Sequence, residues 1–255
     1  MTSSTEHLMQ CGHDVVRVFG LAPKGLVRVD EQGWLGLSGE ERTADLNMAF
    51  IARSAPVSLV EEYAKTILDR GLNAILIVDE DAQPLIEAAA ALGLNAVGNV
   101  PVMVWENLPT PEPQGRYDVR TATAAEMPIV ARLVAQAFAL DEDTISRVCP
   151  PELADHECLQ FWLAFDGDEP VGTGTFVRTD DHCGIYNMGT PAAGQRRGIG
   201  RAVIESAIVH NVADGVTTFT LEATEAGYHL YEQVGFVTVA APTVMLVGES
   251  TQFPG

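Results

Sequence analysis

The sequence predicts an α/β protein built from two similar halves that a proline-rich connector joins. Strand and helix patterns alternate from Tyr117 to Val247, and three prolines alternate with polar residues between Glu106 and Gly115. A shift along the chain also carries residues 58–105 onto 200–247 without a gap. We therefore expect two mixed sheets in tandem, with domains at 1–106 and 117–250 and a linker at 107–116.

The elements of the C-terminal half follow from residue periodicity. Tyr117–Thr121 alternates as a short strand, and the capping box Thr123–Glu126 begins an amphipathic helix that reaches Phe138. The further predicted strands and helices, in chain order, lie at 159–165, 171–178, 183–189, 200–213, 219–223, 229–233, 236–240 and 244–247. This order indicates one large mixed sheet flanked by helices.

The shifted alignment predicts that the N-terminal half is a degenerate copy of the C-terminal half. Its helix at 58–70 falls on 200–212, and its apolar strand at 74–78 falls close to 219–223. Pro56 falls on Gly198, and proline has no backbone N–H to offer. Ala89 stands where the C-terminal half has Tyr231. The N-terminal half is therefore expected to be a structural partner without an active site of its own.

Composition and charge limit the partners of this protein. The chain has 255 residues, of which 47% are apolar, so it can bury a sizeable core. Its net charge of −20, from 15 basic and 35 acidic residues, disfavours nucleic acid and is compatible with a cationic acceptor.

Two further sequence features bear on location and metals. No apolar run is long enough to span a bilayer, and Met1–Gln10 lacks a signal-peptide core, so we expect a cytoplasmic protein without a membrane partner. The four cysteines form no C-x-x-C pair, so neither a metal site nor a disulfide scaffold is expected.

The segment Gln195–Arg201 has the chemistry of a pyrophosphate-binding loop. A turn that runs into a helix offers free backbone N–H groups and the positive end of the helix dipole. Glycines at Gly198 and Gly200 let a phosphate approach the backbone closely, and Arg196, Arg197 and Arg201 add positive charge. A plain strand–turn–helix would carry similar glycines, so the loop alone leaves both readings open.

Two motifs in the expected order resemble the GNAT acetyltransferase superfamily. Gln195-Arg-Arg-Gly-Ile-Gly200 is similar to its (Arg/Gln)-x-x-Gly-x-(Gly/Ala) signature, and Leu230-Tyr-Glu-Gln-Val-Gly-Phe236 is similar to its Leu-Tyr-(x)3-Gly-Phe motif. Thr224 stands where many members have Asn or Ser. The resemblance covers 117–248 and extends to 1–106 only as a degenerate copy. It implies two GNAT-like mixed-sheet domains in tandem, the N-terminal one degenerate.

The resemblance also implies where the coenzyme lies. Met188, Gly189 and Thr190 would contact the pantetheine arm through the strand backbone, and the strand carrying them would splay from the strand at 219–223. The acyl thioester would occupy that gap. The backbone N–H groups that would hold the pyrophosphate are those of Arg196, Arg197, Gly198, Ile199, Gly200 and Arg201.

Acyl transfer to an amine requires a neutral nucleophile, a polarised thioester and a proton for the departing thiolate. Tyr231, in the Leu-Tyr motif, is the predicted general acid. Glu222, which alternates with Leu221 and Ala223, is the predicted general base, and Asn187 is an alternative group for orienting the acceptor or a water. The backbone N–H of Met188 is expected to stabilise the oxyanion.

These features together predict an N-acetyltransferase that uses acetyl-CoA as cosubstrate, with catalysis confined to the C-terminal half. The acceptor, a small-molecule amine or a peptide, and the oligomeric state stay open. A non-catalytic acyl-CoA-binding or sensing module is the alternative, and a purely structural protein is a third reading. The intact Tyr231 favours the enzyme, because a pure binder has less need of that hydroxyl.

Overall fold

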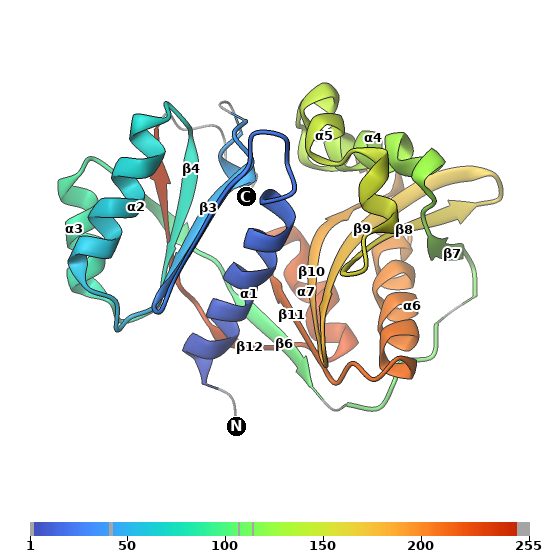
Figure 1. The fold of residues 1–255 in the computed structure, drawn as a ribbon. Helices are drawn as coiled ribbons and strands as arrows, with labels where there is room; N and C mark the ends of the chain where they lie inside the picture. The colour runs from blue at the N-terminus through green and yellow to red at the C-terminus, as the bar shows by residue number, and fades with distance from the viewer. Residues whose placement is uncertain (1–2, 41–42, 107, 114, 249–255) are drawn as a thin grey trace. The chain divides into compact units, whose positions relative to one another are not determined.

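The structure is a computed structural model that describes residues 3–40, 43–106, 108–113 and 115–248. Positions 107 and 114 of the predicted linker, and 249–250 of the predicted second domain, lie outside the described residues. The described chain folds into one six-stranded and one seven-stranded sheet with helices on their faces (Figure 1). This arrangement confirms the predicted α/β class with two mixed sheets.

The elements agree with the periodicity of the sequence over most of their length. The α-helices are α1 (Ser4–Phe19), α2 (Val57–Asp69), α3 (Gln83–Ala91), α4 (Met127–Phe138), α5 (Glu142–Val148), α6 (Ile199–Ala213) and α7 (Glu225–Val234). The strands are β1 (Leu26–Asp30), β2 (Gly33–Leu37), β3 (Asn47–Ile51), β4 (Ala74–Val78), β5 (Asn95–Asn99), β6 (Val102–Glu106), β7 (Asp118–Thr121), β8 (Leu159–Asp166), β9 (Glu169–Thr179), β10 (His182–Gly189), β11 (Thr218–Glu222), β12 (Val237–Ala240) and β13 (Thr243–Val247). Short 3-10 turns include η4 (Ala192–Gly194), which precedes the predicted coenzyme loop.

The six-stranded sheet has the order β1-β2-β3-β4-β13-β5, and helices cover both of its faces (Figure 1). Alternating apolar residues of its strands, such as Leu76 and Met245, form one buried cluster with Leu59 and Tyr63 of α2. On the other face α1 lies so close that a Cβ at Gly12 would meet the Phe50 Cβ at 2.8 Å. Burial on both faces fixes the register of the sheet.

The seven-stranded sheet has the order β12-β6-β11-β10-β9-β8-β7. Long antiparallel pairing joins β8, β9 and β10, while β10 and β11 run parallel. Trp105 of β6 packs edge-on against Phe219 of β11, with ring centroids 5.4 Å apart. A β9 glycine, Gly174, makes room for Met188 on the face that α6 covers, because its Cβ would lie 2.5 Å from the Met188 sulfur.

The internal repeat is visible in the positions of the elements. Shifting residues 58–105 onto 200–247 carries α2 onto α6, α3 onto α7 and β5 onto β12. The same shift carries β6 onto β13, yet β6 pairs in the seven-stranded sheet and β13 pairs in the six-stranded sheet. Each half therefore contributes its last repeated strand to the sheet of the other half.

This exchange changes how the domains are described. The first compact unit runs to Met103 and also takes up Glu222–Thr224 and the chain from Thr238 onward, while the second holds Val104–Leu221 and Glu225–Val237. The predicted boundaries at 106 and 117 follow the chain, whereas the sheets cross them. The physical reason is that strand pairing is non-local and is not encoded by the connector.

Candidate active site

The predicted coenzyme loop is a turn that leads directly into α6. Arg196 has φ of +59° and Gly198 has φ of +84°, so the chain is left-handed on both sides of Arg197. Gly198 is the N-cap of α6 and provides no capping side chain. The first hydrogen bond that reaches back to this cap runs from the Ala202 N–H to the Gly198 carbonyl at 3.0 Å. The amides of residues 199–201 precede that bond and point out of the helix N-terminus.

The three arginines of the loop differ in their contacts. The Arg197 guanidinium pairs with Asp166 at 2.8 Å, and the Arg201 guanidinium donates to Gln233 at 3.2 Å. Arg201 also lies 3.8 Å from Glu205, one turn further along α6. The side chains of Arg197 and Arg201 thus already contact other residues of the protein. The donors that this loop offers to a ligand are therefore mainly its backbone amides.

The strand before the loop separates from its neighbour. The parallel pairing of β10 with β11 ends at Ile185 and Leu221, although β10 continues to Gly189. A register shift interrupts the β9–β10 ladder between Tyr186 and Gly189, where Asn187 has φ of +50°. Such a bulge bends a strand and leaves backbone groups unpaired. Residues 188–190 lie beyond the last β10–β11 pair, in the stretch that the family resemblance implies for the pantetheine arm.

Tyr231 lies on α7 and is buried, with 7% of its surface exposed. Its ring packs edge-on against Phe236 at a centroid distance of 6.0 Å. The ring also lies over Gly227, where a Cβ would meet the Tyr231 hydroxyl oxygen at 3.2 Å. Burial raises the pKa of Tyr231 to about 12, so the phenol stays protonated throughout the physiological pH range.

Glu222 is the last residue of β11, one position beyond the final pair with β10. Its Oε1 is buried and has no hydrogen-bond partner among the described residues. Burial raises the pKa of this carboxyl group to about 7, which makes it half-ionised near neutral pH. Asn187, the alternative polar group, is exposed at the bulge of β10.

A half-open cavity of about 370 Å³ adjoins the outer side of the loop. Its polar lining is made by Arg132, Gln136, Glu169 and Arg197. Neither Tyr231 nor residues 188–190 line it. This cavity is therefore separate from the strand end at which the sequence predicts the thioester.

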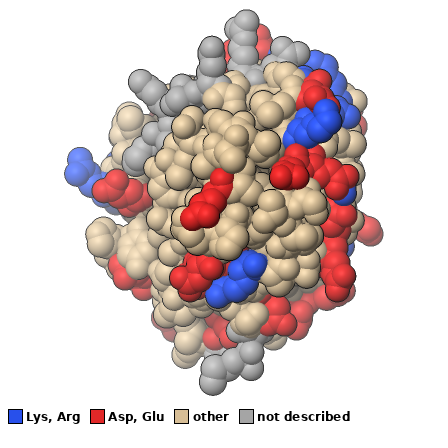
Figure 2. Space-filling model, turned by 90° about the vertical axis from the view of Figure 1, so that its left-hand side faces the viewer, with Lys and Arg blue, Asp and Glu red and all other residues tan. Residues whose placement is uncertain are grey.

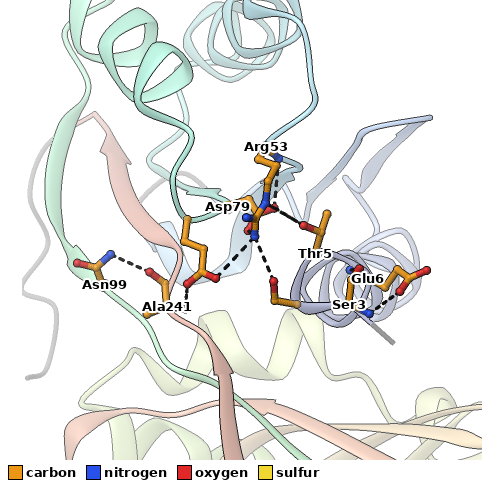
Figure 3. A network of polar contacts seen from close by, with 9 residues as sticks. Ser3, Thr5, Glu6, Arg53, Asp79, Asn99 and Ala241 are labelled. Atoms are coloured by element: carbon orange, nitrogen blue, oxygen red, sulfur yellow. Dashed lines mark hydrogen bonds and ion pairs between the residues drawn. The ribbon is translucent and has the colours of Figure 1, made fainter. Parts of the chain in front are cut away.

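In the N-terminal half, an ion pair between Arg53 and Asp79 lies at the end of the parallel strands β3 and β4, the position that corresponds to the end of β10 and β11. Figure 3 shows this pair in close view. The buried carboxylate of Asp79 accepts from the Arg53 Nε at 2.9 Å, from the Arg53 backbone N–H at 3.2 Å and from the Thr5 hydroxyl at 2.6 Å. The parallel strands β3 and β4 pair up to Ile51 and Val78, their last residues. The Asp79 N–H then extends this ladder to the Ile51 carbonyl at 2.9 Å. The strands β3 and β4 therefore do not separate at their ends.

On the face drawn in Figure 2, acidic side chains are widespread and Lys and Arg are few, in line with the net charge of −20. Within the described ranges, no three His, Cys, Asp or Glu side chains gather as metal ligands. None of the helices in the described part of the chain is long and apolar enough to cross a bilayer.

Comparison with known proteins identifies the class. Residues 157–238 match the profile of the Acetyltransferase (GNAT) domain, a stretch that contains the loop, β10, β11 and α7. The match places a GNAT acetyltransferase domain at residues 157–238. A search of curated protein sequences finds no significant match.

Solved structures share the fold over nearly the whole chain. A GCN5-related N-acetyltransferase from Kribbella flavida is 18% identical, with a TM-score of 0.67 over 94% of this chain and 96% of that one. A GCN5-related N-acetyltransferase from Sphaerobacter thermophilus is 16% identical, with a TM-score of 0.60 over 88% and 82%. A tandem GNAT protein from the clavulanic acid biosynthesis pathway is 11% identical, with a TM-score of 0.58 over 93% and 89%. The tandem fold expected from the repeat is thus found in a solved protein.

Proposed function

We propose that this protein is an acetyl-CoA-dependent N-acetyltransferase whose C-terminal half carries the active site. One observation carries the proposal: the GNAT domain combines a strand end that separates from its neighbour with a helix N-terminus whose first amides are free. Acetyl-CoA carries a thioester and a pyrophosphate in one molecule. The separated strand end would receive the thioester, and the helix N-terminus beside it would bind the pyrophosphate. In the N-terminal half the parallel strands β3 and β4 pair to their last residues, so the first feature is missing there.

The coenzyme would be held mainly by backbone groups. The amides of residues 196–201 would donate to the pyrophosphate, with the positive end of the α6 dipole behind them. Met188, Gly189 and Thr190 would present their backbone edge to the pantetheine arm. This orientation agrees with the Met188 side chain, whose sulfur packs toward Gly174 on the opposite strand.

The chemistry follows from two groups with shifted pKa values. The acceptor nitrogen attacks the thioester carbon, and the C–S bond then breaks as the amide forms. Tyr231, protonated because burial raises its pKa to about 12, would donate its proton to the departing thiolate. The backbone N–H of Met188 would stabilise the oxyanion that develops during the attack.

Glu222 would accept the proton that the amine loses, directly or through a water. A base works best when its pKa lies near the operating pH, and burial raises the pKa of Glu222 to about 7. A lysine-like ammonium group has a solution pKa of ~10.4, so such an acceptor must be deprotonated before attack. A carboxylate whose Oε1 is buried without a hydrogen-bond partner among the described residues is suited to receive that proton.

The acceptor class follows from charge. A surface with a net charge of −20 attracts cationic amines and repels phosphodiester backbones. We therefore propose a small-molecule amine or a peptide amine as the acceptor and exclude nucleic acid from the proposal. No metal has a role in this mechanism.

The test combines two measurements on the full chain. Calorimetric titration with acetyl-CoA is expected to show binding, and a thiol-release assay with pooled amines is expected to show acceptor-dependent turnover. Binding without turnover against any amine would favour the alternative, an acyl-CoA-binding or sensing module. Absence of binding at millimolar acetyl-CoA would contradict both functions.

A further inference from the structure

Tyr117 contacts the middle of the coenzyme loop from a distant part of the sequence. This tyrosine immediately precedes β7 and is buried, with 8% of its surface exposed. Its hydroxyl donates to the backbone carbonyl of Arg197 at 3.0 Å. In Figure 1, β7 forms the edge of the seven-stranded sheet. The hydrogen bond therefore ties the loop to the sheet edge.

The geometry of the peptide bond gives this contact a directional consequence. The Arg197 carbonyl and the Gly198 N–H belong to one planar trans peptide and point in opposite directions. Because Tyr117 holds the oxygen on one side, the Gly198 N–H is directed to the other side. We propose that Tyr117 is a positioning residue that aims the Gly198 N–H at the pyrophosphate of acetyl-CoA. This inference rests on the proposed function.

A second anchor holds the same residue. The Arg197 guanidinium pairs with Asp166, the last residue of β8, at 2.8 Å. Asp118, next to Tyr117, pairs with Phe165, next to Asp166, in the β7–β8 ladder. Backbone and side chain of Arg197 are thus fixed by two adjacent strands. A ligand donor held by such a frame loses little conformational freedom on binding.

The hydroxyl can be separated from the ring of Tyr117. The Arg116 guanidinium lies 5.1 Å from the centroid of this ring. Phenylalanine would keep the ring, its burial and this contact, and would lose only the hydrogen bond to the loop. Without that bond, the peptide between Arg197 and Gly198 can turn and must be ordered again when the pyrophosphate binds.

The experiment compares two acetyl donors with the Tyr117→Phe variant. Acetyl-CoA carries the pyrophosphate, whereas S-acetylpantetheine carries the same thioester and pantetheine without phosphate. The loss of one hydrogen bond predicts that the KM for acetyl-CoA rises by roughly fivefold to tenfold. The kcat for acetyl-CoA and the kcat/KM for S-acetylpantetheine are expected to stay unchanged, because the hydroxyl acts on the loop that would hold the pyrophosphate and not on the thioester.

Tyr63→Phe is the matched control. Tyr63 is fully buried in the N-terminal half and its hydroxyl donates to Asp30 at 2.8 Å, so this variant also loses one hydroxyl bond. It is expected to change thermal stability without changing the KM for either donor. Thermal unfolding of both variants ensures that the comparison is made on folded protein.

The outcomes separate this inference from the function on which it rests. An unchanged KM for acetyl-CoA in Tyr117→Phe, or an equal loss with both donors, would overturn the positioning role. Wild-type protein that fails to bind acetyl-CoA would overturn the proposed function first, and the role of Tyr117 with it.

Discussion

The two halves of this protein differ at the same topological position, the end of a pair of parallel strands. In the N-terminal half, β3 and β4 pair to their last residues, and the Asp79 backbone continues the ladder. In the C-terminal half, the pairing of β10 with β11 ends at Ile185 while β10 runs on through a bulge to Gly189. The duplicated plan therefore offers an opening between parallel strands in one copy and a closed sheet in the other.

The difference extends to the polar groups at the helix that follows. The N-cap of α2 is Pro56 and that of α6 is Gly198. Next to the closed strands the Arg53 guanidinium is satisfied by Asp79, an internal carboxylate. Near the open strand the first amides of α6 are left for an external anion. The closed strand pair thus coincides with an internal ion pair at its end.

The largest effect is expected from Tyr231→Phe. If Tyr231 is the general acid, the variant loses turnover on the order of 10³-fold while its affinity for acetyl-CoA is nearly intact. Thiol release at saturating coenzyme measures the first quantity and calorimetry the second. Tyr228→Phe, on the same helix, is the matched control. Turnover equal to that of wild type would remove the acid role.

Exchanging the N-cap residues of the two helices tests the comparison itself. Gly198→Pro removes an N–H and conflicts with the φ of +84° at this position, so acetyl-CoA affinity is expected to fall by more than about 100-fold. Gly198→Ala keeps the N–H and should lose less. Pro56→Gly in the other half is expected to create no coenzyme binding, since β3 and β4 stay closed. A second binding event in Pro56→Gly would show that Pro56 alone closes that half.

The ion pair of the N-terminal half is expected to matter for stability and not for coenzyme. Asp79→Asn removes the buried carboxylate that faces the Arg53 guanidinium, leaving it only Glu80 at 3.6 Å, and should lower the free energy of unfolding by about 2 kcal/mol. Thermal or urea unfolding measures this change. The dissociation constant for acetyl-CoA should not change. A large change in it would contradict the proposal that the C-terminal half alone binds the coenzyme.

Glu222 gives the smallest effect, and one that depends on pH. Its pKa is raised to about 7 in the folded protein from 4.5, so ionisation above neutral pH costs folding free energy. The stability that its protonated form confers is complete below about pH 4.5 and is lost as pH rises through about 7. Glu222→Gln should therefore stabilise the protein by about 1–2 kcal/mol at pH 8 and leave it unchanged at pH 4.

The same variant tests the base. Wild-type kcat/KM is expected to rise with pH through about 7 as Glu222 ionises, and Glu222→Gln should lose this rise. A pH profile that keeps its rise in the variant would assign the titration to another group. The stability measurement and the rate profile report the same ionisation by independent means.

Part of this site could be predicted from sequence because its signals are local. Gly198, Gly200 and Tyr231 fall within one continuous stretch of the chain that forms the turn, α6, β11 and α7. The contacts of Arg197 with Asp166 and Tyr117 bring together residues far apart in the chain, and no periodicity reports them. The roles assigned to Tyr231, Glu222 and the loop amides stay predictions that the variants above test.

The fold, like the site, could be predicted only where its signals are local in the sequence. Helix and strand periods predicted most elements of the C-terminal half, and the shift of 58–105 onto 200–247 predicted the repeat. The elements α1, β1, β2, β3 and α5 were not predicted. The exchange of β6 and β13 between the sheets could not be predicted from the sequence, because each strand has an apolar pattern that fits either sheet. The pair of Arg53 and Asp79 could not be predicted either, since an ion pair between residues distant in the chain has no spacing signature.

The most direct test of the account is the number of acetyl-CoA molecules bound per chain. Calorimetric titration of the full chain is expected to give one site, retained in Asp79→Asn and lost in Gly198→Pro. Two sites per chain, or one site that persists unchanged in Gly198→Pro, would contradict the assignment of coenzyme binding to the C-terminal half alone.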